Sequence, residues 1–288
     1  MIGNGWPIVR FLLLTTIGTF GSLYSSVDAA LPNVVLIISD DQFADDFGFM
    51  GNAEVRTPNL DQLAARSARF INGTVPTSVC SPSLATILTG LYPHQHGIYF
   101  NHPPPGNSAF NRMSRVDEYR STRQKSFEII KHLDTLPRVL QRDKNYKSFQ
   151  TGKFWEGHIK NEGFTDGMTI FEPVPGQKFG GNRTLSNGEL QPHGNGDWGL
   201  KIGRETMQPI SEFLDQVGRS PFLLWYAPYL PHQPHDSPQR FYDLYYVDDT
   251  IAAHRIPYYA SISQFDETVG QLMEMFESKR LTENTLFI

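Results

Sequence analysis

An apolar run that ends in two acids constrains the fold of this chain more than any other feature. Residues 32–42 read Pro-Asn-Val-Val-Leu-Ile-Ile-Ser-Asp-Asp-Gln. A continuous apolar, β-branched run of this length is typical of a strand buried on both faces, as in a parallel sheet. In open α/β sheets, ligands bind beyond the carboxyl ends of the strands, which is where Asp40 and Asp41 would lie. The run therefore predicts an α/β fold with a site at this point.

The two acids admit two interpretations. Adjacent carboxylates repel each other unless a cation holds them, and an all-oxygen pair suits a hard ion such as Ca²⁺. Aspartates that follow a strand also commonly cap the next turn. The residues alone leave both interpretations open. Asp46, a little further along, is predicted to be structural.

Strand-like and helical segments alternate along the rest of the chain, as a doubly wound sheet requires. Further strands are predicted at 146–150, 221–227 and 285–288. Segments with apolar residues at helical spacing begin near residues 57, 136, 207 and 258. We therefore predict a doubly wound, mostly parallel sheet with helices on both faces. Two polar stretches, 99–128 and 173–203, are predicted to be long loops that set substrate selectivity.

Cys80 is the only cysteine in 288 residues, so the chain cannot form an internal disulfide. Ser-Pro-Ser at 81–83 is typical of a helix start, and Leu84, Ile87 and Leu88 then recur at helical spacing. This places Cys80 at a helix N-terminus, where backbone N–H groups and the helix dipole favour an anion. A free cysteine is also often a buried small hydrophobe.

The segment from Cys80 to Gly90 resembles the signature of the type I sulfatases, Cys-x-Pro-Ser-Arg followed by Thr-Gly. Pro82 and Thr89 match, whereas Leu84 stands where that family usually has arginine. The resemblance implies the alkaline phosphatase/sulfatase-like fold. It also implies that a formylglycine-generating enzyme oxidises Cys80 to formylglycine, whose hydrated aldehyde attacks the sulfate ester. That arginine helps the modifying enzyme recognise the motif, so we expect incomplete conversion.

Three further segments agree with this resemblance in their order. The strand and acid pair match the opening of the sulfatases, which implies that Asp40, Asp41 and residue 80 hold Ca²⁺. Residues 151–157, Thr-Gly-Lys-Phe-Trp-Glu-Gly, resemble the family segment Gly-Lys-Trp-His-Leu-Gly. Lys153 is thereby implied to contact both nucleophile and sulfate, and Trp155 replaces a histidine that orients the nucleophile. The loop after 221–227 resembles Pro-His-x-Pro, which implies that His232 binds the ester and helps to protonate the departing oxygen.

Three other histidines receive lesser roles. His94 and His96 are predicted to lie in a turn after the signature helix and to be structural or at the rim. His158 follows the Lys153 segment and could line the pocket.

The predicted activity is a sulfuric ester hydrolase that releases sulfate from a sulfated sugar or aryl ester. The expected partners are a sulfated small molecule or polysaccharide. Two alternatives stay open. Leu84 and Trp155 leave room for a phosphate or phosphonate ester hydrolase of the same superfamily, and an unmodified Cys80 at a helix N-terminus would suit a non-catalytic anion-binding protein. Thr89-Gly90 and the loop at His232 favour the sulfatase.

The N-terminus has the pattern of a signal peptide. Arg10 precedes an apolar segment, and Val-Asp-Ala at 27–29 provides small residues for cleavage before Ala30. We predict a signal peptide at 1–29, export to the periplasm or medium, and no stable membrane span. Residues 30–288 are then the N-terminal portion of a sulfatase catalytic domain.

Charge and length complete these expectations. The net charge of −5 provides no electrostatic footprint for nucleic acid. A local cation and Lys153 can still attract an anionic substrate. The resemblance implies that sulfatases continue after the strand at 285–288 into further metal ligands and a C-terminal subdomain. We therefore expect this chain to lack that C-terminal part and to be inactive alone.

Overall fold

The computed structural model describes residues 30–106, 115–169, 182–184, 190–192, 198–247 and 249–288. The helices and strands given below belong to the compact unit Leu31–Ile288. The predicted signal peptide, 1–29, lies outside the described residues. No helix of the described part is both long and apolar enough to span a bilayer.

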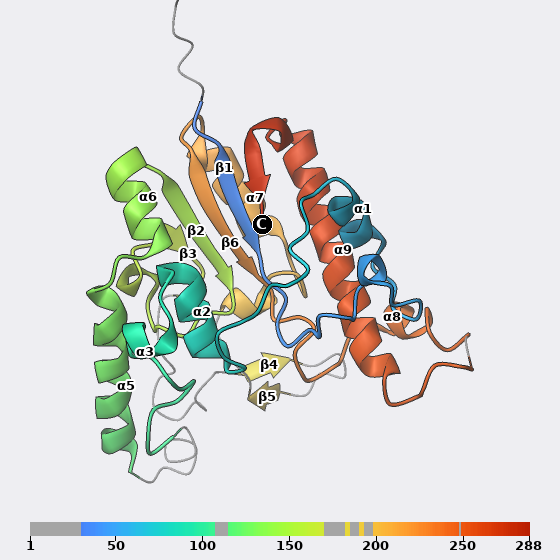
Figure 1. Ribbon diagram of the computed structural model, residues 1–288, viewed down its shortest axis with the longest axis horizontal. Helices are drawn as coiled ribbons and strands as arrows, with labels where there is room; N and C mark the ends of the chain where they lie inside the picture. Colours follow the sequence, from blue (N-terminus) through green and yellow to red (C-terminus); the bar gives the residue numbers. More distant parts are fainter. Residues whose placement is uncertain (1–29, 107–114, 170–181, 185–189, 193–197, 248) are drawn as a thin grey trace, which may run out of the picture. The chain divides into compact units, whose positions relative to one another are not determined.

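Within the described residues, five parallel strands form the central sheet in the spatial order β3-β2-β6-β1-β7 (Figure 1). Their bounds are β1 Asn33–Ile37, β2 Lys147–Gly152, β3 Asp166–Gly167, β6 Phe222–Ala227 and β7 Thr285–Phe287. In β1, Val35 lies opposite Leu224 of β6 and Phe287 of β7. The apolar run is therefore an interior strand, and the strands predicted at 146–150, 221–227 and 285–288 are confirmed.

The described helices are α1 Pro58–Ala65, α2 Cys80–Thr89, α3 Pro93–His96, α5 Val116–Lys131, α6 Leu136–Lys144, α7 Gln208–Val217, α8 Gln239–Tyr242 and α9 Ile256–Ser278. Four of them, α1, α6, α7 and α9, correspond to the predicted segments. Each of these four carries proline in its first turn, where its missing N–H costs no intrahelical bond.

The strands send alternate side chains to opposite faces of the sheet. In β6, Leu224 and Tyr226 belong to one apolar cluster with residues of α7 and α9. Leu223 and Trp225 belong to another with residues of α2, α5 and α6. Figure 1 shows α1 and α9 on one side of the sheet and α2, α5 and α6 on the other. Helices cover both faces, so the predicted doubly wound architecture is confirmed.

Helix α5 shows that the prediction of a loop throughout 99–128 was wrong. The helix buries Tyr119, Arg123, Phe127 and Ile130, which recur at helical spacing. One position of this stripe is an arginine, and the positions around it are mostly polar or charged, so hydropathy alone does not reveal the helix. Residues 107–114 of this stretch lie outside the described residues.

The second predicted loop, 173–203, lies largely outside the described residues. Its described parts include an antiparallel pair, β4 Asn182–Thr184 with β5 Leu190–Pro192. A 3-10 turn follows at Trp198–Lys201.

Close approach of two strand ends shapes the edge where the site lies. Gly152, the last residue of β2, has a φ of +73°. A Cβ atom there would lie 1.8 Å from the carbonyl oxygen of Ala227, the last residue of β6. That oxygen instead accepts the backbone N–H of Lys153 at 2.6 Å. Only glycine permits this approach, which brings the segments after β2 and β6 together.

Candidate active site

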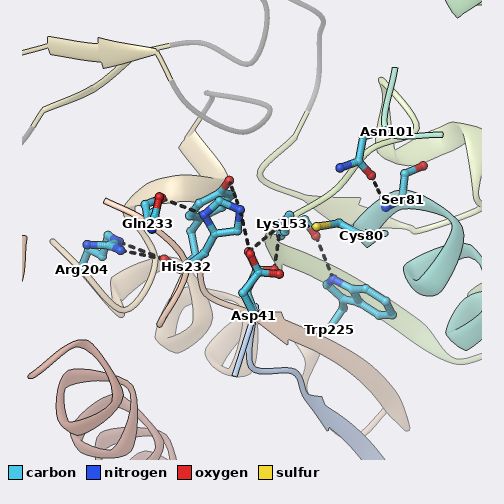
Figure 2. A network of polar contacts seen from close by, with 11 residues as sticks. Asp41, Cys80, Ser81, Asn101, Lys153, Arg204, Trp225, His232 and Gln233 are labelled. Carbon is cyan, nitrogen blue, oxygen red and sulfur yellow. Dashed lines mark hydrogen bonds and ion pairs between the residues drawn. The ribbon is translucent and has the colours of Figure 1, made fainter. Parts of the chain in front are cut away.

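Lys153 joins three elements at the carboxyl edge of the sheet (Figure 2). Its Nζ donates to the two carboxylate oxygens of Asp40 at 2.7 and 2.6 Å, and to Cys80 Sγ at 3.1 Å. Asp40 follows β1, Lys153 follows β2, and Cys80 is the first residue of α2, as its sequence context predicts. Lys153 and Asp40 are 2% and 8% exposed. Burial alone would lower the pKa of Lys153, but Asp40 and then Cys80 raise it above its ordinary value, so the ammonium stays charged.

Asp41 and His232 point toward one another beside this group (Figure 2). Asp41 Oδ2 lies 3.3 Å from His232 Nε2, and the hydroxyl of Tyr229 also lies 3.3 Å from Nε2. His232 Nδ1 lies 2.7 Å from the carbonyl oxygen of Gln233. A carbonyl only accepts, so Nδ1 carries the hydrogen and Nε2 is the nitrogen open to a proton or a ligand. Burial lowers the pKa of His232, with Asp40 opposing that shift.

Asp41, Cys80 and His232 form a group with metal-ligating atoms. Each residue offers one such atom, and the three atoms lie within 4.8 Å of one another. Asp40, also predicted as a metal ligand, faces Lys153 instead. The structure therefore brings together all five predicted site residues, with the two acids facing different partners.

The start of α2 is held by residues that the sequence analysis missed. Val79, at the N-cap, makes no capping hydrogen bond with its side chain. The side-chain oxygen of Asn101 instead accepts the backbone N–H of Ser81 at 2.7 Å (Figure 2). The Ser81 hydroxyl donates to the buried carboxyl group of Glu156 at 3.1 Å. These contacts supply partners at a helix end that the helix itself leaves open.

Arg123 links the segments around this helix start. It is 3% exposed and donates to the carbonyl oxygens of Asn101 and Trp155. Burial raises the pKa of Glu156, and Arg123 opposes that rise. The sequence contains no local signal for this role, because the partners of Arg123 are distant in the chain.

Two other missed residues shape the loop that carries His232. The ring of Tyr229 lies 4.7 Å from Lys153 Nζ, which is a cation–π distance. Arg204 donates to the carbonyl oxygen of Tyr229 and forms an ion pair with Asp236 at 3.0 Å. The proline-rich sequence around Tyr229 marked the loop, whereas nothing in the sequence pointed to Arg204.

The two departures from the sulfatase pattern occupy one apolar cluster. Leu84 and Trp155 both pack there with Leu36 and Trp225. The ring of His102 lies 5.1 Å from that of Trp155 in an edge-to-face arrangement. These positions thus contribute apolar packing where the family pattern has a cation and an imidazole.

The other histidines and Asp46 have local contacts. His96 is buried, lies in α3 rather than in a turn, and contacts the Thr86 hydroxyl at 3.2 Å. His94 is exposed. His158 accepts the backbone N–H of Lys160 at the start of a 3-10 turn. Asp46 accepts a hydrogen bond from Asn52, consistent with a structural role.

Comparisons with known proteins match nearly all of the described unit. A family model described as Sulfatase matches residues 32–288. The chain is 23% identical over 299 residues to an ulvan-active sulfatase of Formosa agariphila, covering 98% of this chain and 54% of that protein. It is 28% identical over 284 residues to arylsulfatase A of Homo sapiens, covering 89% and 51%. The chain thus spans about half the length of the curated relatives it matches.

The fold also matches solved structures. The crystal structure of Ps i-CgsB aligns with a TM-score of 0.67 and 23% identity, over 89% of this chain and 57% of that one. This likeness shows the shared fold.

Proposed function

This chain belongs to the sulfatase family, and from that premise we propose that the protein is a sulfuric ester hydrolase. The substrate is the sulfate ester of a sugar or an aryl alcohol. One observation supports this most directly: Lys153 Nζ lies 3.1 Å from Cys80 Sγ while it pairs with Asp40. An ammonium at this point neutralises negative charge on a sulfate group held next to residue 80.

A sulfated carbohydrate is the substrate class that the relatives favour. One is named an ulvan-active sulfatase, and a related structure contains a neocarrahexaose. We therefore place a sulfated polysaccharide or oligosaccharide first and a small aryl sulfate second. We also propose that the protein is exported, on the signal-peptide pattern of residues 1–29.

The proposal includes a formylglycine-generating enzyme as partner, which converts Cys80 to formylglycine. In its hydrated form this residue supplies the attacking hydroxyl group. Cys80 opens α2, and backbone N–H groups at a helix start favour negative charge. This position therefore suits a nucleophile that approaches an anionic ester.

Ca²⁺ is the proposed metal of the converted protein, held by Asp40, Asp41 and residue 80. Carboxylates provide the oxygen atoms that this ion prefers. Asp40 pairs with Lys153, whose Nζ contacts Cys80. A carboxylate oxygen of Asp41 lies within 4.8 Å of Cys80 Sγ. Asp41 therefore fits a cation placed beside residue 80, and Asp40 would bind the same ion by exchanging its contact with Lys153 for the metal.

His232 is the proposed general acid for the departing alcohol. Its Nδ1 is held by the Gln233 carbonyl, so Nε2 is the atom that carries the transferable proton. Nε2 faces Asp41, whose carboxylate stabilises the protonated ring. The contribution of His232 to the rate thus depends on whether the leaving oxygen must be protonated as it departs.

Substrates with different leaving groups test the role of His232 as a general acid. The test uses the full-length protein after conversion of Cys80 to formylglycine. His232→Ala is expected to lower the rate about 10²- to 10⁴-fold on a sugar sulfate, whose alcohol needs a proton. The loss should be much smaller on nitrophenyl sulfate, because its leaving group, nitrophenolate, departs without a proton. Lys153→Ala should reduce turnover severely on both substrates, and His94→Ala is the matched control. If His232→Ala lowers the rate equally on both substrates, His232 is not the general acid.

The alternative functions separate in two measurements. Hydrolysis rates on nitrophenyl sulfate, nitrophenyl phosphate and nitrophenyl phenylphosphonate distinguish the sulfatase from a phosphate or phosphonate ester hydrolase. Peptide mass spectrometry after coexpression with a formylglycine-generating enzyme should reveal the aldehyde at residue 80. Unmodified thiol with full sulfatase turnover would contradict the proposed nucleophile, and unmodified thiol without turnover would favour a non-catalytic protein.

A further inference from the structure

Three different kinds of metal ligand meet beside Lys153. They are a carboxylate oxygen of Asp41, the sulfur of Cys80 and a ring nitrogen of His232, all within 4.8 Å of one another. We propose that these residues form a zinc site for as long as Cys80 remains a thiol, with the fourth position of the metal open. Zinc binding at this site does not require sulfatase activity.

The donor set suits zinc better than calcium. Thiolate sulfur and imidazole nitrogen are ligands of Zn²⁺, whereas Ca²⁺ takes oxygen. Two ligands at about 2.0–2.1 Å from a tetrahedral zinc lie roughly 3.3–3.4 Å apart. Asp41 Oδ2 and His232 Nε2 are 3.3 Å apart. The carboxylate and the imidazole thus already have the spacing of two zinc ligands.

Neighbouring groups also contact His232 and Cys80. The hydrogen bond from His232 Nδ1 to the Gln233 carbonyl selects the tautomer in which Nε2 carries no hydrogen, as the outer partners of metal-bound histidines do. Lys153 Nζ lies 3.1 Å from the sulfur. Zinc binds cysteine as its thiolate, so metal binding at this site releases the thiol proton.

Charge and access agree with a divalent ion. Lys153 balances the carboxylate of Asp40, with which it forms an ion pair at 2.6 Å. The Asp41 carboxylate and a Cys80 thiolate then carry two negative charges, which one Zn²⁺ balances. The Asp41 side chain is 56% exposed, so an ion can enter from solvent. Ligand set, charge and entry path together describe a metal site.

The chemical state of residue 80 therefore selects the metal. Conversion to formylglycine replaces the sulfur with oxygen, and the donors around residue 80 then suit Ca²⁺. The unconverted protein keeps a sulfur, a nitrogen and an oxygen donor. Zinc binding should accordingly mark protein whose Cys80 has not been converted.

Cobalt is the spectroscopic probe for this site. The 288-residue chain is expressed without a formylglycine-generating enzyme, reduced, and titrated with Co²⁺ while absorption is recorded. We expect one equivalent to produce a thiolate-to-cobalt charge-transfer band, which Zn²⁺ then abolishes. Cys80→Ser should remove the band. Cys80→Ser, His232→Ala and Asp41→Asn should each weaken zinc binding by at least about 100-fold.

His94→Ala and Asp45→Asn are the matched controls, because both residues are exposed and lie outside the cluster. Both should bind zinc as the parent chain does. The absence of a charge-transfer band, or zinc affinity that survives Cys80→Ser, would overturn the proposal.

A second measurement needs no variant. The chain has one cysteine, so alkylation by iodoacetamide reports on Cys80 alone. One equivalent of Zn²⁺ should slow this alkylation at least tenfold, and an unchanged rate would contradict the site. Neither measurement involves turnover, so failure of the zinc site is distinct from failure of the sulfatase proposal.

Discussion

At the residue scale, His102 is a source of acid sensitivity. Burial, followed by the nearby charge of Arg123, lowers its pKa from 6.5 to about 3. Between these two values the unfolded chain binds a proton that the folded chain does not. Stability should therefore fall as pH drops below 6.5, by up to about 1.4 kcal/mol per pH unit, until the pH nears 3. Urea unfolding of His102→Gln, at neutral pH and midway through this window, should reveal a smaller loss than in the parent chain.

The exposed His94 is the control for this prediction. His94→Gln should keep the acid sensitivity of the parent chain. The same loss of stability in His102→Gln as in the parent would place the acid sensitivity elsewhere.

At the element scale, the junction of β2 and β6 depends on Gly152. Gly152→Ala adds a Cβ 1.8 Å from the Ala227 carbonyl oxygen, at a φ of +73°. Backbone strain and overpacking together should cost at least about 3 kcal/mol. Gly90→Ala is the control, because its φ is +69° and nothing lies within 4 Å of the added atom. It should cost only about 1–2 kcal/mol in denaturant unfolding. Equal losses would show that the close approach is unimportant.

The start of α2 provides a second prediction at this scale. The Ser81 N–H has no partner within its own helix, and Asn101 accepts it from outside. Asn101→Ala should cost about 1 kcal/mol and make the Ser81 amide exchange faster, measured by nuclear magnetic resonance. Asn101→Asp keeps an acceptor and should restore protection.

Asn284→Ala is the control, because that side chain donates to the Leu31 carbonyl oxygen far from α2. Unchanged exchange of the Ser81 amide in Asn101→Ala would refute the capping role.

At the scale of the whole molecule, Arg123 joins segments that are distant in sequence. It contacts the loop at Asn101 and the segment at Trp155, and its charge acts on the buried carboxyl group of Glu156. Arg123→Met leaves that group without its cation and should cost about 3 kcal/mol or more. Addition of Glu156→Gln should recover part of this loss. Thermal and urea unfolding of the single and double variants provide the measurement.

Arg240 provides the comparison, because it pairs with Glu267 on the surface. Arg240→Met should change stability by no more than about 1 kcal/mol. An equally small effect of Arg123→Met would mean that the buried guanidinium does not hold these segments.

Local patterns in the sequence predicted the interior strand and most of the helices around the site, whereas the resemblance to the sulfatases indicated Lys153 and His232. The apolar run predicted an interior strand because a strand buried on both faces has no polar positions. Periodicity predicted α9 and α7, and Ser-Pro-Ser after Cys80 predicted the start of α2. Each signal depends on neighbours within a few residues. Helix α5 was not predicted because Arg123 occupies its buried stripe. The carbonyl oxygen of Trp155, distant in the chain, accepts a hydrogen bond from this arginine and makes its burial possible.

Only the tertiary structure decided which residues meet. Strand β6 lies between β1 and β2, so the order of strands in space differs from their order in the chain. That order places Asp40 against Lys153 across 113 residues, and Asp41 against His232. Asn101, Arg123 and Arg204 gain their roles from contacts that no local pattern encodes. Pairing across the sheet depends on how helices and strands pack as a whole, and this is why no local pattern indicated that Asp40 faces Lys153 or that Asp41 faces His232.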